Sequence, residues 1–132
     1  MRIVADANVL IRAVVGDDEH QAQLAMEALR LADEIVITLP AFCEFVWILE
    51  QRYRRPRAAV AASIVALISD PRVACDRSAV DAGLAMMDAG GDFADGVIAF
   101  DGRRLGGEVF VTFDKQAAKL IATQGGAVEL LA

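Results

Sequence analysis

Short β-branched runs alternate with longer segments of helical periodicity along this chain. Apolar positions between residues 20 and 31 recur at a spacing of three to four, which predicts a helix there. Further helices are predicted at 40–52, 57–69, 78–89, 92–104 and 115–123. Strands are predicted at 3–5, 35–38, 73–75, 109–113 and 127–131.

Helices of this length between the strands exclude tight hairpins. They require crossover connections, and therefore a mostly parallel sheet with helices on both faces. The pattern predicts an α/β fold with three α/β/α layers around a short central sheet. The length of 132 residues fits a single domain over residues 1–132.

Composition narrows the classes of function. The chain is 56% hydrophobic and 24% charged, which excludes a disordered protein, and no apolar run is long enough to span a membrane. The net charge of −6 argues against binding nucleic acid by bulk positive charge, so an RNA substrate would need a local basic patch or bound cations. Two cysteines among apolar or helix-forming neighbours indicate a reducing, cytoplasmic compartment.

Five carboxylates occupy informative positions. Asp6 ends the first predicted strand and Asp114 follows the strongest one, and ligands of open α/β sheets bind at the carboxyl ends of the strands. Glu44 lies in an otherwise apolar helix, where burying a lone carboxylate is costly. Asp92 and Asp95 share one face at the start of a helix.

Each acid also has a structural interpretation. Asp6, Asp92 and Asp114 can cap helices, and Asp92 is the best capping candidate because it follows Gly91 at the start of a predicted helix. Glu44 can pair with an arginine such as Arg52 or Arg77. Taken together, however, the acids indicate a shared cluster, whose mutual repulsion a cation would relieve. Oxygen ligands without His or Cys favour Mg²⁺ or Mn²⁺, and such a site is typical of phosphodiester hydrolysis.

Four blocks in order along the chain resemble the acidic motifs of PIN-domain nucleases. They are IVADANVL (3–10), LPAFCEFVWIL (39–49), GDFADGVIA (91–99) and VTFD (111–114). Within that family the chain is most similar to VapC-like toxins of type II toxin–antitoxin pairs. The resemblance implies a Mg²⁺- or Mn²⁺-dependent endoribonuclease that forms a homodimer and is inhibited by a cognate antitoxin protein.

The resemblance also implies roles for individual residues. The catalytic acids are Asp6, Glu44, Asp95 and Asp114, with Asp92 as an additional metal-shell acid. Asn8 and Thr112 match supporting polar positions. Gly96 stands where the family more usually has Ala, which puts local helix stability in doubt.

RNA requires positive charge, and two arginine groups can supply it. These arginines are Arg52, Arg54, Arg55, Arg103 and Arg104. Tyr53 or Phe93 can stack on a splayed base, although arginines at a solvated helix end are the simpler explanation.

Two other functions remain open. An Asp-nucleophile phosphatase would use Asp6, but such enzymes typically carry a second acid two residues on, where this chain has Asn8. A non-catalytic PIN-like interaction module would not need so many acids. A covalent phosphate on Asp6 would favour the former, and loss of stability on replacing Asp6 would favour a structural role.

Overall fold

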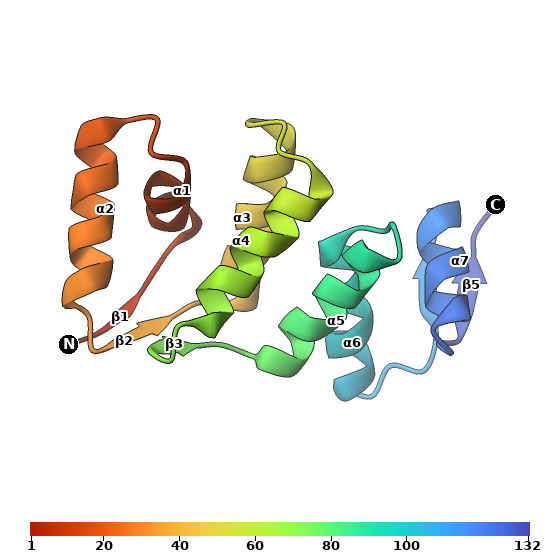
Figure 1. Cartoon of the computed structure of the whole chain (residues 1–132). Helices are drawn as coiled ribbons and strands as arrows, with labels where there is room; N and C mark the ends of the chain where they lie inside the picture. The colour runs from red at the N-terminus through yellow and green to blue at the C-terminus, as the bar shows by residue number, and fades with distance from the viewer. The chain divides into compact units, whose positions relative to one another are not determined.

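The computed structural model describes all 132 residues and has a mixed α/β fold, as predicted. Seven helices and five short strands form two compact units, Met1–Arg77 and Ser78–Ala132. Every strand pairing is parallel (Figure 1). None of the helices combines the length and apolar character needed to cross a bilayer.

The first unit contains three strands and four helices. In chain order they are β1 (Arg2–Val4), α1 (Ala7–Val15), α2 (Glu19–Leu31), β2 (Glu34–Val36), α3 (Leu39–Gln51), α4 (Arg57–Ser69) and β3 (Val73–Ala74). The strands form one parallel sheet in the order β1-β2-β3, with Ile35 opposite Ile3 on one side and Val73 on the other. In this sheet the carboxyl ends of β1 and β2 lead directly towards Asp6 and α3.

The core of the first unit explains why its helices form. In α1, Ala7, Leu10 and Ile11 are buried at helical spacing, and in α3 both Phe42 and Phe45 are completely buried. Helix α1 packs against α2, and α3 packs against α4 (Figure 1).

The second unit contains the remaining three helices and two strands. They are α5 (Arg77–Asp88, which starts at the last residue of the first unit), α6 (Phe93–Arg104), β4 (Phe110–Thr112), α7 (Lys115–Thr123) and β5 (Val128–Leu130). Strands β4 and β5 pair in parallel, with Phe110 opposite Val128, and α7 packs against both strands.

Glycines bring α5 and α6 unusually close together. A Cβ at Gly96 would lie 2.6 Å from the carbonyl oxygen of Ala82, and one at Gly83 would lie 2.5 Å from the ring of Phe93. Phe93 is completely buried as a result, so it is not available to stack on a base, and that part of the sequence-based prediction is wrong.

Helix α1 is the one element that the sequence pattern did not predict. Its β-branched residues, such as Val9 and Val14, have low helix propensity, but the helix has a well-formed cap at each end. Asp6 caps its start, and Gly16 ends it with a positive φ of 69°. The other elements lie within one or two residues of their predicted bounds.

Candidate active site

Asp6 joins β1 to α1 and caps that helix. Its Oδ1 accepts a hydrogen bond of 3.0 Å from the backbone N–H of Val9, while the side chain remains exposed. The capping interpretation of Asp6 is therefore correct. It does not exclude a second role, because capping uses only one of the two carboxylate oxygens.

Asp114 has the same arrangement at the start of α7. Its Oδ1 accepts hydrogen bonds from the backbone N–H groups of Gln116 at 2.9 Å and Ala117 at 3.0 Å. The Thr112 hydroxyl in turn accepts the N–H of Asp114 at 2.9 Å, which fixes the turn between β4 and α7. Asp114 therefore keeps Oδ2 free of these capping bonds.

Asp92 and Asp95 lie at the start of α6. Asp92 occupies the N-cap position, but its side chain makes no capping hydrogen bond, although the sequence made it the best capping candidate. Partial burial raises the pKa of Asp95, and the negative charges of Asp92 and Asp114 raise it further. The starts of α6 and α7 thus form a patch of negative potential within the second unit.

Glu44 lies in α3 of the first unit, and its side chain is exposed. The helix avoids the cost of burying this carboxylate, because Phe42, Phe45 and Val46 turn inward while Glu44 lies on the outer face of the helix. Neither Arg52 nor Arg77 forms an ion pair with Glu44 within the unit that holds α3. Its carboxylate remains open to solvent.

Asp6 also lines an open groove of about 510 Å³ between α1 and α2. Three further polar residues, Asn8, Arg12 and Gln21, line the same groove, and the rest of its surface is apolar. Asn8 is exposed in the first turn of α1. Sequence reasoning missed Arg12 and Gln21. The helix that places Arg12 four residues after Asn8 on the same face was itself not predicted, so the sequence pattern gave no signal for Arg12.

The predicted basic residues have different surroundings. Arg52, Arg54 and Arg55 are all exposed directly after α3, where Arg54 has a positive φ of 52°. Tyr53 between them is half-buried, and its hydroxyl donates a 2.9 Å hydrogen bond to Asp17. This contact fixes the hydroxyl of Tyr53 but does not cover the faces of its ring, so base stacking by Tyr53 stays a prediction.

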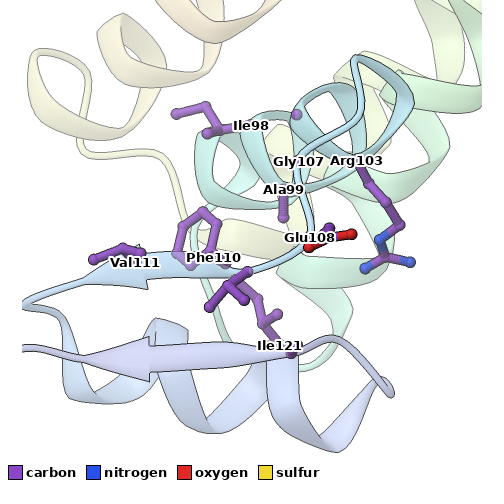
Figure 2. Close-up of a pocket in the computed structure, with 11 residues that line it drawn as sticks. Ile98, Ala99, Arg103, Gly107, Glu108, Phe110, Val111 and Ile121 are labelled. Atoms are coloured by element: carbon purple, nitrogen blue, oxygen red, sulfur yellow. The ribbon is translucent and has the colours of Figure 1, made fainter.

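Arg103 and Arg104 lie at the end of α6. Arg104 forms an ion pair with Asp101 and lies 5.6 Å from the centroid of the Phe100 ring. Arg103 borders a cavity of about 210 Å³ with Glu108, over an apolar lining that includes Phe110 and Ile121 (Figure 2). None of the predicted catalytic acids lines this cavity, so the acidic residues and the cavity of Figure 2 are separate features.

The acids are thus divided between the units, with Asp6 and Glu44 in the first and Asp92, Asp95 and Asp114 in the second. The structure contains no group of three or more His, Cys, Asp or Glu side chains arranged to hold a metal ion. What it provides is carboxylate oxygens not used in capping, which are the hard donors that Mg²⁺ prefers.

A comparison with known protein families identifies the chain. The sequence profile of the PIN domain matches residues 3–122, a range that covers most of each unit and includes every predicted acid. The chain belongs to the PIN domain family. PIN domains are generally metal-dependent nucleases that act on RNA, so this chain has a nuclease-type fold. A search of curated proteins found no match to this PIN domain.

Proposed function

We propose that this PIN domain is a Mg²⁺- or Mn²⁺-dependent endoribonuclease and the toxin of a toxin–antitoxin pair. Asp6, Glu44, Asp95 and Asp114 would be its catalytic acids and metal ligands, with Asp92 as a further ligand. The observation that carries the proposal is the patch at the starts of α6 and α7, where burial and two neighbouring charges raise the pKa of Asp95. A divalent cation would relieve this repulsion.

The donor set fits such a cation. Asp6 and Asp114 each use Oδ1 for capping, so their side chains are held in place while Oδ2 is available. Asp92 makes no capping bond, and Glu44 is exposed. When bound, Mg²⁺ or Mn²⁺ supplies an activated water and neutralises charge on the phosphate. Asn8 would support Asp6, and Thr112 would support Asp114 through their hydrogen bond.

The partners follow from the same proposal. RNA would be the substrate, contacted by Arg52, Arg54, Arg55, Arg103 and Arg104. A homodimer and a cognate antitoxin would cover apolar surface, and the side chain of Trp47, 56% exposed on α3, is available for such a contact. We also propose a cytoplasmic location, because two cysteines among apolar or helix-forming neighbours are typical of proteins from a reducing compartment.

The test is RNA cleavage by the purified protein with Mg²⁺ and with EDTA. Asp95→Asn should abolish the Mg²⁺-dependent cleavage, because it removes one charge of the patch without removing a capping bond. Glu108→Gln is the matched control. Glu108 is also an acid of the second unit, but it is exposed, precedes β4 and is not one of the proposed metal ligands. Products without cyclic phosphate ends would indicate that water, and not the ribose hydroxyl, attacks the phosphorus.

Two results would contradict the proposal. Cleavage that persists in EDTA would exclude a metal-dependent reaction, and cleavage that Asp95→Asn leaves unchanged would exclude Asp95 as a catalytic acid. A covalent phosphate on Asp6 would support the phosphatase. RNA binding without cleavage under any metal condition would support the non-catalytic module.

A further inference from the structure

The groove between α1 and α2 joins a predicted catalytic acid to a cation that has no assigned role. Asp6 and Arg12 both line it, and Arg12 is the only positively charged residue among its lining residues. The chain as a whole carries a net charge of −6, so each cation beside a catalytic acid matters for attracting a polyanion. The groove therefore places a carboxylate and a guanidinium on one open surface.

The geometry of α1 sets the spacing of these groups. Asn8 and Arg12 are four residues apart and both line the groove, so they lie on one helical face. Asp6 precedes Arg12 by six residues, which corresponds to about 9 Å along a helix axis. That separation lets one strand of RNA place one phosphate at Arg12 and another at a cation that Asp6 would hold.

The Arg12 guanidinium is held in place by two residues outside the helix. Its Nη1 donates to Oδ1 of Asp17 at 3.1 Å, and the Tyr53 hydroxyl donates to Oδ2 of the same carboxylate at 2.9 Å. The hydrogen bond from Tyr53, together with the charge of Arg12, lowers the pKa of Asp17. Asp17 therefore remains ionised and keeps the arginine oriented at neutral pH.

This contact uses only part of the guanidinium. Arginine carries five N–H donors, and here the bonds to Asp17 come from one nitrogen, Nη1. The Arg12 side chain is 35% exposed, so the rest of the planar group can be reached from solvent. A planar guanidinium that is already oriented suits bidentate binding of phosphate oxygens.

We propose that Arg12 binds a backbone phosphate of the RNA, close to the phosphate that is cleaved, and that Asp17 and Tyr53 are its positioning residues. This inference rests on the proposed ribonuclease function. It adds a substrate-binding residue from α1 to the arginines that follow α3 and those in the last turn of α6. The alternative is that Arg12 only ties α1 to the loop that contains Asp17.

Binding of a single-stranded RNA oligonucleotide in EDTA tests Arg12 without cleavage. Arg12→Gln should weaken binding about tenfold at low salt and reduce the slope of log K against log salt by about 0.7, as expected for the loss of one phosphate contact. Arg12→Lys should retain most of the slope because it keeps the charge. Tyr53→Phe should keep the slope while weakening binding less than Arg12→Gln does.

Arg30→Gln is the matched control. Arg30 also pairs with an acid in the first unit, Glu27, but it does not line the groove. Its replacement should leave RNA affinity and salt slope close to those of the unmodified protein. In Mg²⁺, Arg12→Gln should raise KM about tenfold with little change in kcat, because binding of a neighbouring phosphate is uniform along the reaction.

The two proposals fail in different ways. If the unmodified protein cleaves RNA but Arg12→Gln and Arg30→Gln have the same affinity, slope and KM, the phosphate-binding role of Arg12 is overturned and the nuclease stands. If Arg12→Gln and Arg12→Lys lose melting temperature equally and bind RNA as tightly as Arg30→Gln, Arg12 is only a structural tie. If the unmodified protein neither binds nor cleaves RNA, the proposed function fails and this inference fails with it.

Discussion

The hydroxyl of Thr112 accepts a hydrogen bond from the backbone N–H of Asp114 at a distance of 2.9 Å. Through this bond the last residue of β4 fixes the residue that caps α7. The carboxylate of Asp114 then caps the helix with Oδ1 alone. The three residues from Thr112 to Asp114 thus link the end of β4 to the start of α7 and fix the position of a candidate metal ligand.

Replacing Thr112 should therefore affect both stability and catalysis. We expect Thr112→Val to lower the free energy of unfolding by about 1 kcal/mol, since it removes the acceptor of the Asp114 amide. Cleavage of RNA should fall as well, because Asp114 loses its fixed position. Denaturant unfolding and RNA cleavage measure the two effects. Thr112→Ser keeps the hydroxyl and should restore both; a Ser variant as poor as Val would contradict this role.

Two variants of Asp6 separate capping from catalysis. Asp6→Ala should lower the free energy of unfolding by about 1 kcal/mol through loss of the α1 cap, whereas Asp6→Asn can still accept from Val9 and should retain most of the stability. Both should lose Mg²⁺-dependent cleavage. Thermal unfolding in EDTA and RNA assays in Mg²⁺ provide the comparison. Full activity of Asp6→Asn would show that Asp6 is a cap and nothing more.

The raised pKa of Asp95 predicts a pH dependence in EDTA. The folded protein holds this proton more tightly than the unfolded chain, whose reference pKa is 3.8. The contribution of Asp95 to stability is therefore complete below that value and is lost as pH rises through the higher folded pKa. Asp95→Asn should remove this loss and be the more stable protein at neutral pH without metal. Urea unfolding of both proteins from acid to neutral pH measures the difference, and parallel curves would refute it.

Two glycines of α6 should respond to alanine in opposite directions. A Cβ at Gly96 would meet the Ala82 carbonyl oxygen at 2.6 Å and the Met86 Cβ at 2.8 Å, whereas nothing lies within 4 Å of one at Gly102. We expect Gly96→Ala to destabilise the protein through this clash with backbone. Gly102→Ala should stabilise it by up to about 1 kcal/mol, the difference in helix propensity. Melting temperatures of the two variants decide the question; stabilisation by both would show that α5 and α6 separate at little cost.

The elements with strong periodicity and clear breakers were predictable from the sequence. Helices α4 and α7 have their predicted bounds, because Pro56 and Pro71 limit one and Asp114 and Gly125 limit the other. Helix α1 escaped prediction because its apolar β-branched residues are typical of a strand. Its formation depends on the burial of Leu10 and Ile11 and on its two caps, and neither can be predicted from the residue types of the segment alone.

The candidate acids were predictable as a set, but their local roles were not. Sequence preference favoured Asp92 as a cap, yet Asp6 and Asp114 make the capping bonds and Asp92 makes none. Which carboxylate reaches a backbone N–H depends on the turn before the helix. The exposure of Glu44 depends on how α3 rotates to bury Phe42 and Phe45, which residue type alone does not determine. The pairing of Arg12 with Asp17 and Tyr53 joins distant segments and had no local signal.

The ring of Phe93 occupies the space that a side chain at Gly83 would need. In the sequence, Phe93 directly follows Asp92 and precedes Asp95 by two residues. The first turn of α6, which carries both acids, is therefore fixed by a side chain that is completely buried. A bulkier residue at position 83 would push on this side chain and shift the first turn of α6. For the proposed nuclease, selection for altered metal preference should thus find changes on α5 as readily as among the carboxylates themselves.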